Sequence, residues 1–429
     1  MLYRSLNKKS ELVDFEKAIK LGLASDGGLF FPNTISHINK DFIESIENYS
    51  NIEIAYQVLK QFVGNTISEL DLKNILKNTI DFDFPLVQLE ENIFSLELYH
   101  GPTLAFKDVG ARFMANCLGY YNQNMSKLTT VLVATSGDTG AAVANGFLGV
   151  KGTKVVILYP KNKVSEIQER QLTTNKKNIT ALRVKGTFDD CQKMVKKAFN
   201  DKELNDKFNL TSANSINVAR WLPQSLYYFY AYKKLKIKNL VFSIPSGNFG
   251  NICAGIIAKE LGLPIKHFIA STNINDTIPR YFKNGVLEPN KTIATISNAM
   301  DVSNPSNFIR ILEVFKNFKN LKKNMSSYSF NDNETLDLIK KIYNSKQYVL
   351  DPHGAVGLLG LNKYLKINSK NTGVFLETAH PIKFSKHIEK CLGIKLNTPN
   401  KIKKILDNKK EFIDIDNYEK FKKTLLNFG

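Results

Sequence analysis

The sequence predicts an α/β protein with parallel β-sheets and a mostly helical N-terminal region. Three observations support this fold class. Four apolar, β-branched runs are separated by helix-like stretches, the first 90 or so residues show helical spacing of apolar side chains, and the composition is that of a globular chain. Hydrophobic residues make up 43% and charged residues 23% of the chain. Its 429 residues are enough for about two to four domains with substantial cores.

The N-terminal region, residues 1 to about 90, has two apolar faces at helical spacing. These faces comprise Leu12, Phe15, Ala18, Ile19 and Leu21 in the first, and Ile54, Val58, Leu59 and Phe62 in the second. Between them, residues 25–28 form a Gly-rich turn that leads into a short extended piece ending at Pro32. We therefore expect a small helical unit before the sheets begin.

The predicted strands are the four apolar runs, residues 128–134, 154–160, 239–244 and 373–376. The first and third lead through Gly-rich polar loops into apolar, helix-like stretches. Strands that alternate with helices favour parallel sheets. Ligand sites in such sheets lie at the carboxyl ends of the strands, which is where these polar loops occur.

Cysteine, histidine and hydropathy patterns argue against several classes of protein. The four cysteines and six histidines are scattered, without the spacing of a disulfide framework or a metal site, so we expect no metal centre. No apolar run reaches the roughly 20 residues of a membrane span. The N-terminus has no secretory stretch, and Glu11, Asp14 and Glu16 argue against an organellar presequence. We expect a soluble, cytoplasmic protein without membrane contact.

The formal net charge is +19, from 59 Lys and Arg against 40 Asp and Glu. Such a charge would suit nucleic acid or anionic small molecules. Only seven of the 59 are Arg, and the 52 lysines are spread along the chain without interleaved aromatic residues. Arg would be prominent if base edges were read. We therefore expect a basic surface without nucleic-acid binding; a binding protein that has lost catalysis is the rival from another class.

Two polar loops follow predicted strands and precede predicted helices, residues 135–140 and 245–251. Backbone N–H groups at a helix N-terminus, together with the helix dipole, can bind an anion such as phosphate. For residues 245–251 a simple tight turn is as consistent with the sequence, and no Gly-Lys-Ser/Thr follows as in a P-loop. Two such loops suggest a ligand with two anionic ends.

Lys107 follows an apolar stretch and precedes a helix-like run. A lysine in apolar surroundings at a helix start should have a lowered pKa and can form a Schiff base. Spacing alone does not distinguish it from the other lysines, most of which must be solvated surface residues.

Four segments, taken in order, resemble the threonine synthase family, a branch of the pyridoxal-phosphate enzymes that share the tryptophan-synthase β-subunit fold. They are residues 101–108 (GPTLAFKD), 136–140 (SGDTG), 246–251 (SGNFGN) and 377–381 (ETAHP). Residues 25–29, 212–217, 300–307 and 351–357 are also similar to family segments. The resemblance runs from near residue 3 to about residue 391. The helical N-terminal region and the length resemble the branch found in fungi and many bacteria.

The resemblance implies two parallel-sheet αβα domains of the tryptophan-synthase β-subunit type (pyridoxal-phosphate fold type II), plus the mostly helical N-terminal domain. The implied domains are residues 1–90, a large cofactor-binding domain of residues 91–126 and 236–429, and a smaller mobile α/β domain of residues 127–235. Family members occur as monomers and as dimers, so we expect a monomer or homodimer.

The implied activity is conversion of O-phospho-L-homoserine and water to L-threonine and phosphate, the last step of threonine biosynthesis, with pyridoxal 5'-phosphate held as a Schiff base on Lys107. The alternative is a phospho-lyase of the same family that yields 2-oxobutyrate. Cofactor motifs would be shared by both. A relative that replaces a group at the β-carbon, such as a cysteine- or tryptophan-forming enzyme, agrees less well with the sequence. The N-terminal domain and the acidic residues Asp108 and Asp138 argue against it.

The resemblance also assigns site residues. Lys107 would be catalytic. The cofactor phosphate would lie among residues of the 246–251 loop, namely Ser246, Gly247, Asn248, Phe249 and Asn251. Thr378 would meet the pyridine nitrogen through its hydroxyl group, and Asp138 would lie close to the cofactor edge.

For the substrate, we expect Ser136 and Thr139 at the carboxylate and Asn214, Ser215 and Arg220 at the leaving phosphate. The guanidinium fork of Arg220 suits a phosphate, although packing beside Trp221 explains it equally well. His353 and His380 are expected to be structural.

Overall fold

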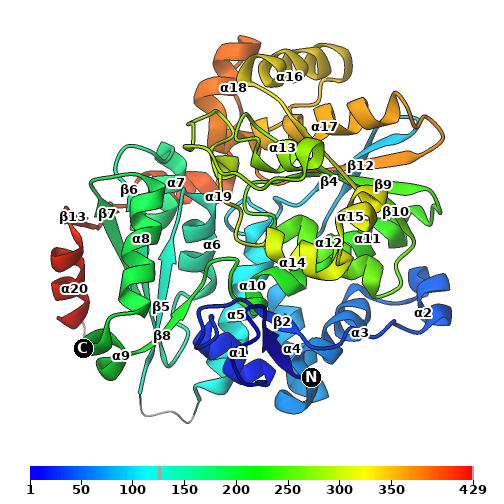
Figure 1. The fold of residues 1–429 in the computed structure, drawn as a ribbon. Coiled ribbons are helices and arrows are strands. Elements are labelled where there is room, and N and C mark those ends of the chain that lie inside the picture. The colour runs from blue at the N-terminus through cyan, green and yellow to red at the C-terminus, as the bar shows by residue number, and fades with distance from the viewer. Residues whose placement is uncertain (124–126, 428–429) are drawn as a thin grey trace.

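The structure, a computed structural model, describes residues 1–123 and 127–427. Two separate sheets, each covered by helices, stand side by side, and the helical N-terminal region packs beneath them (Figure 1). The smaller sheet lies on the left of Figure 1 and the larger on the right. The predicted α/β class with parallel sheets is confirmed. Within the described residues, every helix is too short or too polar to span a lipid bilayer.

The N-terminal region is mostly helical, as predicted. Its elements are β1 (Tyr3–Ser5), α1 (Phe15–Leu21), β2 (Phe30–Pro32), α2 (Lys40–Glu44), η1 (Ile46–Asn48), α3 (Asn51–Val63), η2 (Gly64–Thr66) and α4 (Glu69–Thr79). Ser50 begins α3 through a reciprocal capping box with Glu53, which satisfies two backbone donors at the helix end. The second predicted apolar face is wholly buried on α3, whereas Leu12 and Leu21 of the first face are 49% and 41% exposed.

The larger sheet has the strand order β11-β10-β9-β12-β4-β3. Its strands are β3 (Leu86–Glu90), β4 (Ile93–Glu97), β9 (Leu240–Pro245), β10 (Ile265–Thr272), β11 (Met325–Ser329) and β12 (Thr372–Glu377). All neighbours are parallel except β3 and β4, which form an antiparallel pair. The sheet is buried on both faces, so strands such as β9 read as continuous apolar runs.

Helices cover both faces of the larger sheet. Val241, Ile269 and Phe375 share one cluster with residues of α16 (Asp332–Lys346) and α17 (Pro352–Leu365), whereas Phe242 and Phe268 lie in another with residues of α12 (Gly250–Glu260). Alternate side chains of β9 thus point to opposite faces. The remaining helices of this part are α5 (Lys107–Tyr121), α11 (Leu226–Leu235), α13 (Thr277–Asn284), η4 (Asn298–Met300), α14 (Phe308–Phe315), α15 (Phe318–Asn324), η5 (Pro381–Phe384) and α18 (Ser385–Leu392).

The smaller sheet is wholly parallel, with the order β13-β7-β6-β5-β8. Its strands are β5 (Thr129–Ala134), β6 (Thr153–Pro160), β7 (Ile179–Val184), β8 (Asn209–Ser212) and β13 (Ile413–Ile415). The associated helices are α6 (Asp138–Gly146), α7 (Glu166–Thr173), α8 (Phe188–Phe199), α9 (Lys202–Lys207), α10 (Val218–Trp221), η3 (Leu222–Ser225), α19 (Asn400–Leu406) and α20 (Tyr418–Leu426). The four predicted strands are confirmed as β5, β6, β9 and β12.

Two strands pair with a sheet other than the one that the expected domain ranges imply. β3 belongs to the larger sheet although we expected residues 1–90 in the N-terminal domain. β13 pairs with β7, so residues 413–415 join the smaller sheet, and Phe421 of α20 packs in its core. The predicted boundary at residue 126 and the end of the chain, residues 428–429, lie outside the described residues. The domain ranges themselves stay a prediction.

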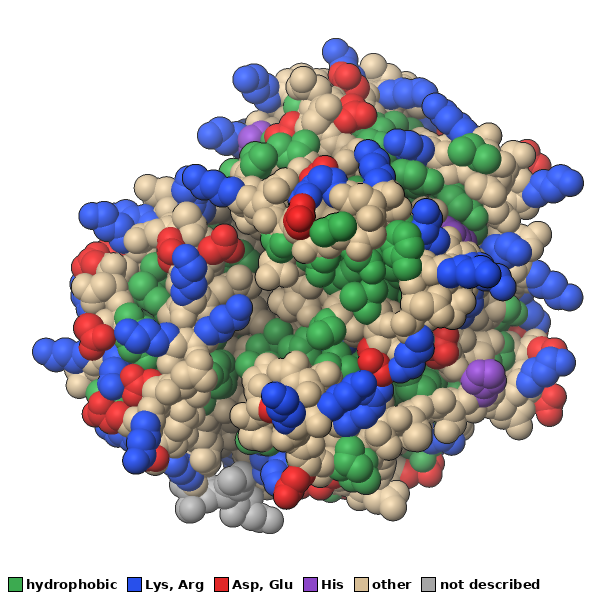
Figure 2. Space-filling view, in the orientation of Figure 1, with side chains coloured by type: hydrophobic (Ala, Val, Ile, Leu, Met, Phe, Trp, Pro, Cys, Tyr) green, Lys and Arg blue, Asp and Glu red, His purple; other side chains and the backbone are tan. Residues whose placement is uncertain are grey.

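The surface is basic without one dominant patch on the face in view. Figure 2 shows Lys and Arg side chains scattered over this face among Asp and Glu. A few lysines pair with a carboxylate three or four residues away, such as Lys73 with Glu69 and Lys420 with Asp416. The absence of nucleic-acid binding stays a prediction.

Candidate active site

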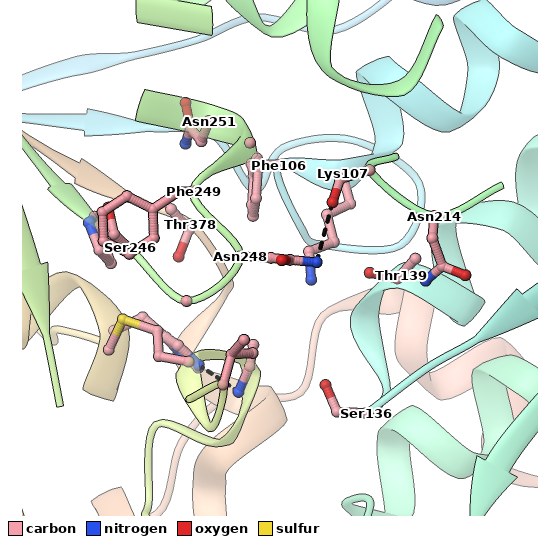
Figure 3. A pocket seen from close by; sticks show the side chains of 18 of the residues that line it. Phe106, Lys107, Ser136, Thr139, Asn214, Ser246, Asn248, Phe249, Asn251 and Thr378 are labelled. Carbon is pink, nitrogen blue, oxygen red and sulfur yellow. Dashed lines mark hydrogen bonds between the residues drawn. The ribbon is translucent and has the colours of Figure 1, made fainter. Parts of the chain in front are cut away.

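One cavity lies where the carboxyl ends of β5, β9 and β12 approach each other, between the two sheets (Figure 3). All but one of the residues that we predicted for the site line it. They are Lys107, Ser136, Thr139, Asn214, Ser215, Arg220, Ser246, Gly247, Asn248, Phe249, Asn251 and Thr378. The exception is Asp138, which does not belong to the described lining.

Lys107 is the first residue of α5, at the wall of the cavity. The chain just before it is held by the segment that follows β12. The Phe106 N–H donates to the Thr378 carbonyl at 2.9 Å, and the His380 N–H donates to the Leu104 carbonyl at 3.1 Å. These bonds place Thr378 and Lys107, 271 positions apart in the sequence, on adjoining parts of one wall (Figure 3).

Burial lowers the pKa of Lys107 to about 8. The Asp138 carboxylate acts in the opposite direction, and the cations of Arg220 and Lys383 lower the pKa further. An ammonium group removed from water loses solvation, so the neutral amine is favoured. Lys107 therefore exchanges its proton near neutral pH, as a nucleophilic or general-base amine must.

The loop between β9 and α12 lines the cavity opposite α5. Phe249 adopts the left-handed conformation, with φ of 60°, directly before α12. A Cβ on Gly247 would lie 2.7 Å from both the Ala299 carbonyl oxygen and the Met300 Cα, so only glycine fits. The Asn248 side chain is fixed from two sides, since its Oδ1 accepts from the Ser306 N–H at 2.7 Å and its Nδ2 donates to the Ser215 Oγ at 3.2 Å.

Three buried side chains in this cavity keep polar atoms unpaired among the described residues: Asn251 Nδ2, Arg220 Nε and Nη1, and Gln224 Oε1. Asn251 is otherwise fixed, because its Oδ1 accepts from the Tyr228 hydroxyl at 2.9 Å. Burial lowers the pKa of Arg220 to about 10, yet it remains a cation at neutral pH. Unpaired buried donors are costly in a folded protein and mark places where a ligand can accept hydrogen bonds.

The loop between β5 and α6 supplies the wall away from Thr378 (Figure 3). The Thr135 Oγ1 accepts from the N–H groups of Gly137 at 2.9 Å and Gly140 at 2.8 Å, which shapes the start of α6. Gly137 has φ of 134°, a region suited to glycine. Ser136 and Thr139 line the cavity from this loop.

Asp138 is engaged outside the lining. Its Oδ1 forms a 2.7 Å ion pair with Lys383 and accepts from the Gln168 Nε2 at 3.0 Å. Although burial alone would raise its pKa, the neighbouring Lys383 and Lys107 lower the pKa of Asp138 to about 2. It is therefore a carboxylate that accepts hydrogen bonds near, but not in, the cavity.

Asn214 lines the cavity but its amide is already used. The side chain accepts from the Ala134 N–H at 3.1 Å and donates to the Ala134 carbonyl at 2.7 Å, at the end of β5. Ser215 accepts at its Oγ from Asn248 and Asn307. Of the three residues predicted for the leaving phosphate, Arg220 therefore has the most hydrogen-bonding capacity left.

His353 also lines the cavity, and its orientation is fixed. The Nε2 accepts from the Ala299 N–H at 3.2 Å, so the proton is on Nδ1, 2.6 Å from the Asp351 Oδ1. Burial and the Asp351 carboxylate raise the pKa of Glu377 well above its ordinary value. His380 is neutral, because burial lowers its pKa to about 4.

Several lining residues were missed by sequence reasoning, namely Phe106, Phe188, Gln224, Ala299, Met300 and Val302. Phe106 and Gln224 are sequence neighbours of predicted residues, so proximity to Lys107 and Arg220 was an available signal. Met300 and Val302 belong to the 300–307 segment, whose resemblance to the family was also an available signal. Only the fold shows that Ala299 and Met300 pack against Gly247.

Comparison with protein families gives three consecutive matches. Residues 2–80 match the family described as threonine synthase N terminus. Residues 83–378 match the family of pyridoxal-phosphate dependent enzymes. Residues 354–425 match the threonine synthase C-terminal family.

Individual relatives agree over nearly the whole chain. A threonine synthase of Buchnera aphidicola subsp. Baizongia pistaciae is 47% identical over 403 residues, 93% of each chain. That of Escherichia coli K12 is 42% identical, over 93% of this chain and 92% of its own. Among solved structures, Escherichia coli threonine synthase has a TM-score of 0.94 at 39% identity, covering 100% of both chains. A pyridoxal-phosphate-bound threonine synthase from Brucella melitensis has a TM-score of 0.93 at 33% identity, covering 100% of this chain and 99% of its own.

Proposed function

The chain belongs to the threonine synthase family of pyridoxal-phosphate-dependent enzymes, and we propose that its cavity converts O-phospho-L-homoserine and water to L-threonine and phosphate. The observation that carries this proposal is the meeting, in one cavity, of a lysine amine of lowered pKa, an anion cradle at a helix N-terminus and a second set of unpaired cationic donors.

The residues present fit pyridoxal phosphate. The loop of residues 246–249 leads directly into α12, whose N-terminus favours negative charge, and Gly247 lets this loop pack closely against the Ala299–Met300 backbone. The unpaired Asn251 Nδ2 is a further donor for a phosphate oxygen. We propose that Ser246, Gly247, Asn248, Phe249 and Asn251 hold the cofactor phosphate, and that Lys107 Nζ is the point of attachment.

When bound, the cofactor supplies an electron sink for charge that develops on the substrate carbon. Thr378 lines the same cavity, and we propose that its hydroxyl group meets the pyridine nitrogen. A hydroxyl does not enforce a protonated ring as a carboxylate would. We propose that Asp138 lies close to the edge of the cofactor. Its carboxylate balances the positive charges of Lys107 and Lys383.

Lys107 Nζ is the group proposed to move protons. Since its pKa is about 8, part of the population carries a neutral amine at physiological pH that can accept a proton from the substrate α-carbon. The ammonium form can then return the proton. Arg220 and Lys383 keep the pKa low, and Asp138 prevents it from falling further.

The two charged ends of the substrate match two walls of the cavity. We propose that Ser136 and Thr139, with the start of α6, bind the carboxylate. Arg220 and Ser215 would bind the departing phosphate, because the Arg220 guanidinium has two unpaired buried nitrogens and such forks bind phosphate strongly. Asn214 would act on this wall by holding Ala134 at the end of β5.

In the net reaction the bond between the γ-carbon and the phosphate oxygen breaks and the γ-carbon gains a proton, while the β-carbon loses a proton and gains the hydroxyl group of water. The α-proton is removed and later returned, so it does not change in the balance. Water must reach the β-carbon late, so we propose that residues 127–235 form a mobile domain that closes over the site. Identical open geometry in crystals with and without ligand would refute this closure.

The cytoplasmic location and the monomeric or homodimeric state stay predictions. Cys117, Cys191 and Cys253 are buried free thiols, which suits a reducing compartment.

Product analysis tests the proposal. The purified holoenzyme is incubated with O-phospho-L-homoserine, and threonine, phosphate and 2-oxobutyrate are quantified. We expect equal amounts of threonine and phosphate, no product from Lys107→Ala, and wild-type rates from the control Lys390→Ala, which replaces an exposed lysine of α18. Phosphate released with 2-oxobutyrate would instead indicate the phospho-lyase, and release of no phosphate would refute both activities.

A further inference from the structure

A second lysine is buried beside the cavity. Lys383 lies in η5, a few residues after Thr378, and its side chain is 0% exposed. Its Nζ is 2.7 Å from the Asp138 Oδ1 and donates to the Thr103 carbonyl at 2.9 Å. Asp138 follows a strand of the smaller sheet, whereas Thr103 and Lys383 follow strands of the larger one. The lysine therefore joins the two halves of the molecule.

Thr103 extends this junction to Lys107. Its N–H and hydroxyl both donate to the Asp108 carboxylate, at 2.9 and 2.5 Å, and Asp108 follows Lys107 in the first turn of α5. The Thr103 carbonyl accepts a second bond, from the Gln171 Nε2 of α7 at 3.0 Å. One residue thus receives bonds from both halves and anchors the helix start that carries Lys107.

Asp138 extends the junction to the Ser136–Thr139 loop. It is the first residue of α6, and Gln168 of α7 donates to it at 3.0 Å. A Cβ on the preceding Gly137 would lie 2.4 Å from the Gln168 side chain, so the loop and α7 are packed without slack. A shift of the Lys383 ammonium would therefore move Ser136 and Thr139 relative to Lys107.

We propose that Lys383 is a positioning residue, whose buried ion pair with Asp138 sets the distance between the Ser136–Thr139 loop and Lys107. The inference rests on the proposed function in that it takes this loop as the substrate side of the cavity. Lys383 does not line this cavity, but it lines an adjoining cavity that shares Ser136 and Phe188 with it. Its ammonium group is held by Asp138 and Thr103, and through these two residues it would act.

The energetics favour a positional role over a purely stabilising one. Burying two charges costs solvation that their attraction barely offsets, so an apolar pair of similar size would stabilise the junction as well. The Lys383 ammonium instead has two acceptors in fixed directions, the Asp138 carboxylate and the Thr103 carbonyl, and these two bonds fix its position. The charged groups acting on Lys107 are Asp138 from α6, Arg220 from α10 and Lys383 from η5, so Lys383 also balances Asp138.

The test compares Lys383→Met, Asp138→Asn, the double variant, and the control Lys390→Met on exposed α18. Three quantities are measured: thermal unfolding midpoints, KM and kcat for O-phospho-L-homoserine, and the rate at which the apoenzyme takes up pyridoxal phosphate as a function of pH. The last readout needs no turnover, so it stays informative if the proposed substrate is wrong.

We expect Lys383→Met to raise KM about tenfold or more with a smaller effect on kcat, and to move the midpoint of the uptake profile up by roughly one pH unit, since a cation facing Lys107 is lost. The double variant should unfold at a higher temperature than the less stable single variant, because it carries no unpaired buried charge. Lys390→Met should match the wild type.

The inference is wrong if Lys383→Met leaves KM and the uptake profile unchanged, or if the destabilisations of the two single variants simply add in the double variant. Should Lys383→Met fail to fold, the double variant decides: a folded double variant with raised KM supports the ion pair, and an unfolded one contradicts it. A wild-type enzyme that takes up cofactor but forms no threonine would refute the proposed function. The pH profiles of cofactor uptake would still test the positioning role of Lys383.

Discussion

Replacing Gly247 by alanine is the most sharply defined perturbation of the cofactor cradle. The new methyl group would lie 2.7 Å from the Ala299 carbonyl oxygen and 2.7 Å from the Met300 Cα. Both atoms belong to backbone, and Ala299 is held in place by its N–H bond to His353. Since no flexible side chain can move aside, either the 246–250 loop or the 299–300 segment must shift.

Relief of such overpacking costs about 1 to 3 kcal/mol. If the 246–250 loop shifts, this free energy is lost from cofactor binding. Pyridoxal phosphate should then bind to the apoenzyme about 5- to 150-fold more weakly. The matched control is Gly357→Ala on α17, where a Cβ would lie at an ordinary 3.4 Å from the Pro245 Cδ. The control should bind the cofactor normally.

The assay is titration of each apoenzyme with pyridoxal phosphate, followed by the absorbance of the bound cofactor, with thermal unfolding as a check on folding. Unchanged affinity in Gly247→Ala would refute the assignment of this loop as the phosphate cradle. Equal weakening in both variants would show that added volume anywhere near β9 has the effect, and would refute the role of the close approach at Gly247.

Three other predictions address separate parts of the site. The rate of cofactor uptake by the wild-type apoenzyme should rise about tenfold per pH unit and level off near pH 8, because the neutral amine of Lys107 reacts and its pKa is about 8; a plateau reached only above pH 10 would contradict this. Asn251→Ala should weaken cofactor binding by roughly 10- to 150-fold, the value of one hydrogen bond to a charged group, and equal dissociation constants in the same titration would argue against Asn251 as a phosphate ligand. Asp351→Ala should lower the free energy of unfolding by about 2 to 4 kcal/mol, because it removes the cap of α17 and the acceptor of His353; a loss below about 0.5 kcal/mol in denaturant unfolding would contradict this.

Local features of the site could be predicted from the sequence, because they depend on short-range rules. β5 and β9 are apolar runs that end in Gly-rich loops, and such loops at helix N-termini suit anions whatever the rest of the fold. Lys107 at the first position of α5 was also expected from its surroundings. What spacing could not do was distinguish Lys107 from the other lysines, and the family resemblance supplied that choice.

Contacts between distant segments could not be predicted. The closeness of Ala299 to Gly247 and the ion pair of Lys383 with Asp138 each depend on how segments far apart in the sequence pack together. A buried lysine looks like a surface lysine in a single sequence, because only tertiary structure determines its exposure.

The C-terminal segment illustrates the same limit. Its lysine-rich sequence forms two short helices, α19 and α20. The three-residue strand β13 between them is too short for periodicity to indicate. Its pairing with β7, supported by the Arg183–Asp414 ion pair at 2.7 Å, depends on a partner more than 200 residues away.

We propose that Lys107, alone among the 52 lysines, carries the cofactor in this cavity. The most direct measurement is reduction of the holoenzyme with borohydride, followed by proteolysis and mass spectrometry of every lysine-containing peptide. We expect one pyridoxyl adduct per chain, on Lys107. An adduct on Lys383 or on any other lysine, or no adduct at all from cofactor-saturated protein, would contradict it.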